Sequence, residues 1–151
     1  MKQIELVGGK EMVTWNYGVM WKGIALADPA RPAQMFGDVV YSWGDFHQRS
    51  NALAADMLTA GLESQAKVAH YLYNCPEYLE ATFASYLAGF VPVNTNYRYG
   101  PEEITYLFDN SDAEAVVFHA VFVDLCAQVR PALPKVKRWY MVPDESGTAL
   151  P

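Results

Sequence analysis

Short runs of apolar residues alternate along the chain with longer stretches in which apolar residues recur every three or four positions. The short runs are typical of buried strands, and they comprise Val68–Tyr73, Phe90–Val93, Ala115–Phe118 and Arg138–Val142. The longer stretches between them predict helices, and they begin near Asn74, Pro101 and Val121. Because connections between parallel strands are almost always right-handed, the elements should form one mostly parallel sheet with helices on both faces. The predicted fold class is therefore α/β.

Two local signals refine this alternation. Asn74 offers an N-cap for the first crossover helix, with Pro76 in its first turn and Glu77 at its third position, and Gly89 is placed to stop that helix. Pro92 lies within the second strand and cannot donate to a sheet ladder, so it indicates an edge strand or an irregular start.

A helical leader and a β-hairpin precede the alternation. A short helix is expected over about 14–27, and the prolines that follow should end it. Gly37 and Asp38 separate two apolar runs, and glycine tolerates the positive φ of a two-residue turn, so these runs are predicted to pair as a hairpin. We divide the chain into a leader helix with its linker, residues 1–32, and an α/β portion, residues 33–151.

The strongest helix signal covers residues 43–60. Ser42 and Asp45 fit a capping box, in which each side chain satisfies a backbone amide of the first turn. Gly61 lies where a left-handed residue is favoured just after a helix. His47 falls on a polar stretch of this helix, and we expect its side chain to face solvent.

Charge and composition disfavour nucleic acid, membranes and metal ions as partners of this chain. Seventeen acidic residues against eleven basic ones give a net charge of −6, which disfavours nucleic acid and anionic membranes as partners. No eighteen apolar residues run together and no apolar leader segment is present, so we expect a cytoplasmic protein without a transmembrane segment. The two cysteines and three histidines lack metal-ligand spacing, and no metal site is predicted.

Ligands of open parallel sheets bind beyond the carboxyl ends of the strands, and this rule selects three loops, 73–75, 94–100 and 119–120. The loop 94–100 is the richest, because Tyr97, Arg98 and Tyr99 precede a helix N-terminus. Arg98 and the helix dipole together can hold an anion there. In the alternative, the tyrosines pack the loop and Arg98 pairs with an acidic residue of the following helix, Glu102 or Glu103.

Two histidines and one cysteine are further candidates for a functional site. His119 ends a predicted strand, yet no nucleophile lies near it in sequence, so it is the weakest of the ligand-binding candidates. His70 lies in a predicted buried strand and is expected to be a core histidine. Cys75, near a helix start, is either a thiol with a lowered pKa or simply a packed side chain.

The order of several motifs resembles the opening of the adenylate-forming acyl-CoA synthetases. The motifs are VYSWGDF at 40–46, RSNALA at 49–54, AGFVPVN at 88–94, NYRY at 96–99 and EEITYLFDNS at 102–111. The likeness spans about residues 14–143, and the NYRY version is similar to the branch that activates fatty or sterol side-chain acids.

The resemblance implies ATP, Mg²⁺ and coenzyme A as cofactors and a small-molecule carboxylic acid as substrate. Members of the family convert the acid to an acyl-adenylate and then to a thioester. Their phosphate loop, their adenine and ribose contacts and their C-terminal lysine match no segment here, so no catalytic residue is assigned. The chain is expected to be the incomplete N-terminal part of the large domain and to be inactive alone.

The same resemblance places Tyr97 and Arg98 near the nucleotide end of coenzyme A, whereas Asp124 stands where relatives have basic contacts. Ser146-Gly147-Thr148 lacks the second glycine and the lysine of a phosphate loop and is read as a surface turn. Two alternatives stay open: a non-catalytic α/β scaffold that forms homo-oligomers, and a flavodoxin-type nucleotide domain, which the lack of a glycine-rich first turn disfavours.

Overall fold

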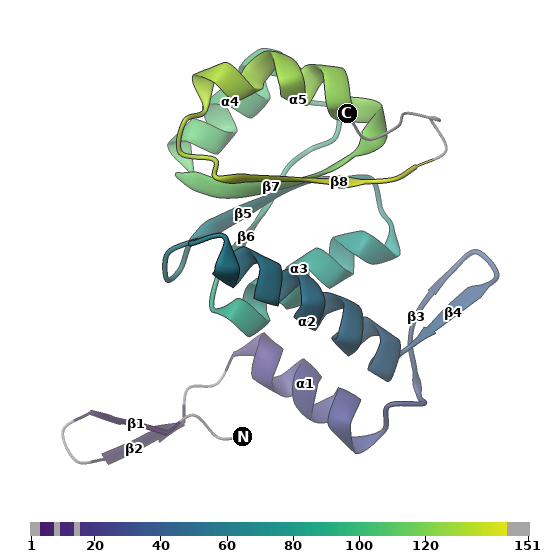
Figure 1. Cartoon of the computed structure of the whole chain (residues 1–151). Coiled ribbons are helices and arrows are strands. Elements are labelled where there is room, and N and C mark those ends of the chain that lie inside the picture. Colours follow the sequence, from purple (N-terminus) through teal and green to yellow (C-terminus); the bar gives the residue numbers. More distant parts are fainter. Residues whose placement is uncertain (1–3, 8–9, 14–15, 145–151) are drawn as a thin grey trace.

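A four-stranded parallel sheet lies between two layers of helices in the computed structural model, which describes residues 4–7, 10–13 and 16–144 (Figure 1). The sheet contains β5 (Lys67–Tyr71), β6 (Val91–Asn94), β7 (Ala113–His119) and β8 (Arg138–Val142). The connections contain α3 (Pro76–Ala88), α4 (Pro101–Asn110), η1 (Ala120–Phe122), α5 (Val123–Val129) and η2 (Arg130–Ala132). The strand order is β6-β5-β7-β8 and every pairing is parallel, so the predicted sheet is confirmed.

Six elements precede the sheet. They are β1 (Ile4–Val7), β2 (Lys10–Val13), α1 (Tyr17–Ala27), β3 (Pro32–Phe36), β4 (Val39–Ser42) and α2 (Trp43–Thr59). The leader helix and the β3–β4 hairpin are confirmed, and Gly37 at the hairpin turn has a φ of +57°. The antiparallel pair β1–β2 was not expected from the sequence. None of the helices in the described ranges is long and apolar enough to cross a bilayer.

The side chains of β7 alternate between two hydrophobic clusters, one on each face of the sheet. Ala115 and Val117 pack with residues of α2 and α3. Val116 and Phe118 pack with residues of α4 and α5. This alternation follows from the pleat of a strand, and a strand buried on both faces has almost no polar positions. Helices therefore cover both faces, as predicted.

Local signals set several element boundaries. The Ser42 hydroxyl accepts a hydrogen bond from the Asp45 amide at 3.1 Å, and the Asp45 carboxylate accepts one from the Ser42 amide at 3.3 Å, which confirms the capping box. Gly61 and Gly89 both have positive φ after their helices. Pro92 lies in β6, which is an edge strand of the described sheet, as predicted.

Helix α1 packs closely on α3. A Cβ atom at Gly18 would lie only 2.7 Å from a backbone carbon of Tyr86, so the two helices meet at a position that admits no side chain. Trp21 extends the contact, because its ring lies 5.3 Å from the ring of Phe83 and 5.7 Å from that of Phe46. The leader helix thus shares an aromatic cluster with α2 and α3.

Two sequence predictions are wrong in detail. His47 does not face solvent; it is half-buried, with its ring 5.8 Å from that of Phe83, because both α1 and α3 pack against α2. The N-cap of α3 is Cys75 rather than Asn74, so the helix starts one residue later than predicted and Pro76 is its first residue. The turn expected at 146–148 lies outside the described residues.

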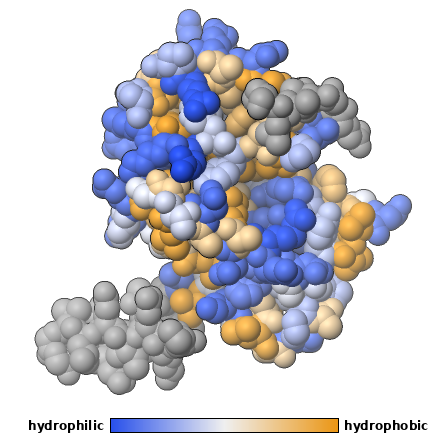
Figure 2. Space-filling view, in the orientation of Figure 1, coloured by the Kyte–Doolittle hydropathy of each residue, from blue (hydrophilic) through white to orange (hydrophobic). Residues whose placement is uncertain are grey.

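Exposed apolar side chains gather on the projecting β3–β4 hairpin, whereas hydrophilic side chains dominate the neighbouring face (Figure 2). The hairpin residues concerned are Met35, Phe36, Val39 and Val40, each more than half exposed. The hairpin therefore contributes little to the core and borders the carboxyl edge of the sheet through Phe36, which lines a cleft described below.

Candidate functional site

The carboxyl ends of the parallel strands meet at one edge of the sheet, and the loops that leave them are tied together by hydrogen bonds. The Thr95 amide, just after β6, donates to the His70 carbonyl in β5 at 3.1 Å. The Tyr73 amide, just after β5, donates to Nδ1 of His119 at the end of β7, at 2.9 Å. The structure thus brings the predicted loop 94–100 and His119 to the same edge, with Tyr73 between them.

An aromatic cluster forms the floor of this edge. The Tyr73 ring lies 4.9 Å from the Tyr97 ring, 5.3 Å from Phe122, and 5.4 Å from the His119 ring, on which it stacks. The Tyr71 hydroxyl donates to the Tyr99 carbonyl at 2.6 Å. Burial raises the pKa of Tyr71 to about 12, so this phenol stays a neutral donor at physiological pH. The loop 94–100 therefore contacts Tyr71 and Tyr73, and Tyr73 in turn packs on His119 of β7 and Phe122 of η1.

Arg98 projects from this loop as an exposed cation. Its guanidinium carbon lies 5.2 Å from the centre of the Tyr97 ring, a cation–π distance. Its amide donates to the Asn96 side chain at 3.0 Å, which fixes the backbone turn. Within the described residues Arg98 forms no ion pair, so the predicted alternative, pairing with an acidic residue of α4, is not found.

The N-terminus of α4 is already occupied by one of its own acidic residues. Oε2 of Glu103 accepts a hydrogen bond from the Gly100 amide at 2.8 Å and caps the helix. The expectation that the helix dipole and Arg98 jointly hold an anion is therefore weakened, because a carboxylate stands at the helix end. The guanidinium of Arg98 is the group of this loop that can meet an anion.

His119 faces a cleft of about 390 Å³ beside the loop. The cleft is lined by Phe36, Tyr73, Asn74, Cys75, Glu77, His119, Pro143 and Asp144. The imidazole is 5% exposed, and burial lowers its pKa although the carboxylates of Asp144 and Glu77 oppose that shift. Because Nδ1 accepts the Tyr73 amide, the neutral ring carries its proton on Nε2. The ring is therefore a neutral hydrogen-bond donor.

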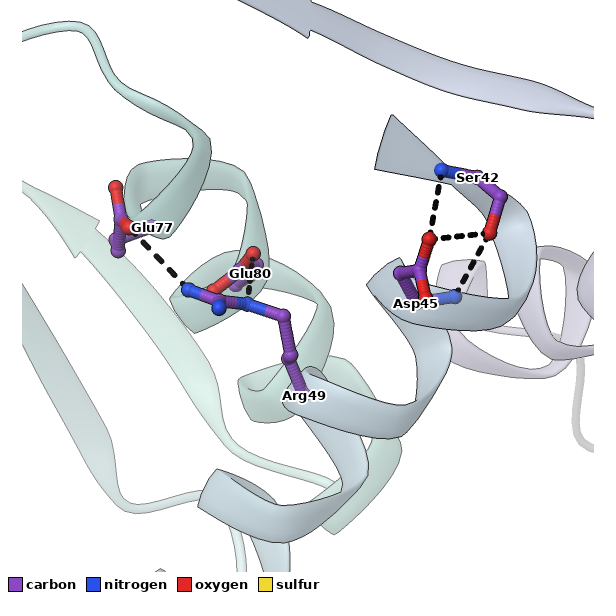
Figure 3. Close-up of polar contacts among 5 residues, drawn as sticks. All are labelled: Ser42, Asp45, Arg49, Glu77 and Glu80. Atoms are coloured by element: carbon purple, nitrogen blue, oxygen red, sulfur yellow. Dashed lines mark hydrogen bonds and ion pairs between the residues drawn. The ribbon is translucent and has the colours of Figure 1, made fainter. Parts of the chain in front are cut away.

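Glu77 is held on the rim of the cleft by a cation from α2. Arg49 approaches Oε1 of Glu77 at 3.2 Å through Nη2 and Oε1 of Glu80 at 2.7 Å through Nε (Figure 3). Glu80 is 5% exposed, and burial raises its pKa while Arg49 offsets part of that effect. The two ion pairs join α2 to the first turns of α3.

Cys75 and His70 are structural rather than reactive. Burial raises the pKa of the Cys75 thiol to about 11, which makes the activated-thiolate reading wrong and favours the packed one. His70 is fully buried, as expected, and burial lowers its pKa to about 4. Its Nε2 has no hydrogen-bond partner among the residues that the structure describes, and its Nδ1 lies 3.5 Å from the Thr82 hydroxyl.

Sequence reasoning gave Tyr73 no role beyond its place in the loop 73–75, and it overlooked Asp144. Tyr73 links His119 to Tyr97, and the Asp144 carboxylate accepts the Val121 amide at 2.7 Å. Both residues follow the carboxyl end of a strand by two positions, so the rule that selected the loop 73–75 could also have found Asp144. Within the described residues no group of three His, Cys, Asp or Glu side chains is arranged to hold a metal ion.

Comparisons with known proteins agree with this fold. The AMP-binding enzyme family matches residues 24–149. The medium-chain acyl-CoA ligase Mig of Mycobacterium avium is 34% identical over 142 residues, which cover 85% of this chain and 26% of Mig. A medium/long-chain-fatty-acid-CoA/3-oxocholest-4-en-26-oate-CoA ligase of Mycobacterium tuberculosis (strain ATCC 25618 / H37Rv) is 35% identical over 120 residues, which cover 80% of this chain and 22% of that ligase. The chain therefore spans about a quarter of the length of these curated relatives.

Solved structures show the same arrangement of elements. A structure assigned as a long-chain-fatty-acid CoA ligase from Rhodopseudomonas palustris CGA009 matches with a TM-score of 0.80 at 29% identity, covering 91% of this chain and 35% of that one. The N-terminal domain of FACL13 from Mycobacterium tuberculosis matches with a TM-score of 0.78 at 20% identity, covering 85% of this chain and 34% of that one. The second likeness concerns the fold alone.

Proposed function

Since the chain belongs to the AMP-binding enzyme family, we propose that it forms the N-terminal part of the large domain of an ATP-dependent acyl-CoA ligase. The family match over residues 24–149 carries this proposal, and relatives at 34% and 35% identity that are CoA ligases support it. Within the proposal, residues 1–32 are a leader and residues 33–151 belong to the adenylation domain. The cytoplasm remains the expected location.

The reaction would proceed in two steps. A carboxylate is a poor electrophile, because its negative charge repels a thiolate. Transfer to ATP masks that charge, releases pyrophosphate and gives an acyl-adenylate. The thiolate of coenzyme A then attacks the acyl carbon, and AMP leaves as the thioester forms. The names of the relatives favour a medium- or long-chain fatty acid or a sterol side-chain acid as the substrate.

The described residues of this chain do not fit ATP or Mg²⁺. No metal-ligand cluster is present among them, and residues 1–151 contain no glycine-rich phosphate loop with its lysine. No described residue of this chain is therefore assigned to adenylate formation, and we propose that other segments of the ligase bind the nucleotide and magnesium.

The part we assign to this chain is a contact with coenzyme A. The guanidinium of Arg98 is exposed, is oriented over Tyr97 and has no carboxylate partner among the described residues. Such a group forms strong, charge-assisted hydrogen bonds with phosphate. Tyr97 supplies the ring under the cation, and His119 offers an Nε2–H donor in the neighbouring cleft.

The test separates the two half-reactions in the full-length ligase that contains this chain. Arg98→Ala should raise the KM for coenzyme A about tenfold or more, since a hydrogen bond to a charged group contributes about 1.5–3 kcal/mol. Acid-dependent pyrophosphate release should stay unchanged. Arg138→Ala is the matched control, because Arg138 is an exposed arginine at the opposite, amino end of β8.

Two outcomes would count against the proposal. If no acid in a broad panel of fatty and sterol acids causes pyrophosphate release, the ligase assignment fails. If Arg98→Ala and Arg138→Ala give the same KM for coenzyme A as the wild type, the assigned contact fails while the ligase assignment stands.

A further inference from the structure

We infer that Tyr73 and His119 are positioning residues for Arg98, and that they act on its guanidinium through the ring of Tyr97. This inference rests on the proposed contact between Arg98 and coenzyme A. It adds a role for two residues that do not themselves need to touch the ligand. The series His119, Tyr73, Tyr97 and Arg98 is called the aromatic support below.

The exposed end of the support has little else to orient it. In the part of the chain that the structure describes, the Arg98 side chain contacts the Tyr97 ring and forms no ion pair or side-chain hydrogen bond. A flexible arginine loses rotamer entropy when it binds a phosphate. A ring fixed beneath the guanidinium reduces that loss, because it restricts the free side chain to the orientations that bind.

The Tyr97 ring in turn depends on Tyr73. Tyr97 is 39% exposed, and the Tyr73 ring lies 4.9 Å away at an interplanar angle of 59°, within the range of favourable tilted pairs. Tyr73 is itself 41% exposed and has no side-chain hydrogen bond among the described residues. Its ring orientation therefore depends on the aromatic surfaces of His119 and Phe122 beside it.

The buried end of the support is rigid. His119 is the last residue of β7, is 5% exposed and pairs in register with Val142 of β8. It holds Tyr73 twice, by stacking on the ring at 5.4 Å and by accepting the amide at 2.9 Å. The hydrogen bond needs an unprotonated Nδ1. The charged groups that line the cleft around this ring are Glu77 of α3 and Asp144 after β8, with the Cys75 thiol beside them.

Steady-state kinetics of the full-length ligase can test whether the support acts through Arg98. Tyr73→Leu removes the ring and should raise the KM for coenzyme A about fivefold, the equivalent of one aromatic pair, while pyrophosphate release stays unchanged. Tyr73→Phe keeps the ring and should restore the wild-type KM. Tyr106→Leu is the control for loss of an exposed tyrosine, because Tyr106 on α4 is 71% exposed.

The double variant Tyr73→Leu/Arg98→Ala decides the mechanism. If Tyr73 acts only through Arg98, the double variant should have the same KM for coenzyme A as Arg98→Ala alone. An additional fivefold increase in the double variant would overturn the inference, since Tyr73 would then contribute independently of Arg98. If Arg98→Ala raises the KM and Tyr73→Leu does not, the positioning role is wrong and the proposed contact stands.

A second variant keeps the test possible if Tyr73→Leu does not fold. Unchanged pyrophosphate release shows that Tyr73→Leu is folded; if that release is lost, His119→Asn replaces it in the same assays. Asparagine keeps an acceptor for the Tyr73 amide but removes the stacked ring, so the inference is supported if the KM rises in His119→Asn but is no higher in His119→Asn/Arg98→Ala than in Arg98→Ala alone. A wild-type KM in His119→Asn would overturn the role of His119.

Discussion

Protonation of His70 should make the stability of this chain depend on pH between about 4 and 6.5. The imidazole is fully buried in β5, and burial lowers its pKa from 6.5 to about 4. Between these values the unfolded chain binds a proton at this residue and the folded chain does not. Acidification therefore favours unfolding, and the stability present above pH 6.5 is lost as the pH falls toward 4.

The magnitude follows from the same two pKa values. The interval from 6.5 to about 4, at about 1.36 kcal/mol for each pH unit, corresponds to about 3 kcal/mol. This is a large part of the stability of a small domain, which is about 5–15 kcal/mol. Urea denaturation at pH 7, 5.5 and 4.5 should show it as a midpoint that falls by about 1–2 M.

His70→Phe isolates this contribution. The variant keeps a ring of similar size and removes Nε2, which has no hydrogen-bond partner in the described part of the chain, while Thr82 keeps its bond to the Tyr78 carbonyl. His47 and His119 also have pKa values lowered by burial, so part of the acid sensitivity should remain in the variant. The reasoning is refuted if His70→Phe loses stability with falling pH as steeply as the wild type.

Two further predictions concern the helices. Gly18→Ala should destabilise the fold by about 1–3 kcal/mol, because the added Cβ would lie 2.7 Å from the backbone of α3. Gly23→Ala in the same helix is the control: its Cβ would meet nothing within 4 Å, so it should stabilise the fold by up to about 1 kcal/mol, and thermal melts compare the two variants. Glu80→Ala should lower the free energy of unfolding by about 1–3 kcal/mol and Glu77→Ala by less than about 1 kcal/mol, because Glu80 is the buried partner of Arg49. Urea denaturation measures both, and equal effects would contradict this account of the ion pairs.

Periodicity and turn chemistry were sufficient to predict most of the fold. The Ser42 capping box and the positive φ of Gly61 depend on residues close in sequence. The apolar run of β7 follows from burial of both faces of that strand. The environment of His47 could not be predicted in this way. Its burial results from α1 and α3 packing on the same helix, a tertiary contact that the local pattern does not encode.

The candidate site was predicted only in part for the same reason. The end-of-strand rule identified the loop around Arg98 and the position of His119. It did not reveal that Tyr73 joins them, because that contact depends on the register between β5 and β7 and on side-chain orientation. Likewise, the sequence placed two glutamates beside Arg98, and only the structure shows that Glu103 is engaged with its own helix.

The two-sided burial of β7 has a consequence for how this chain tolerates change in length. Neighbouring side chains of the strand belong to opposite helix layers, as Val116 and Val117 do. Deleting one residue within the strand would exchange the faces of every following side chain, so that Phe118 would point toward α2 and α3 and Val117 toward α4 and α5. Length variation in relatives of this chain should therefore occur in the loops at either end of β7 and not within it.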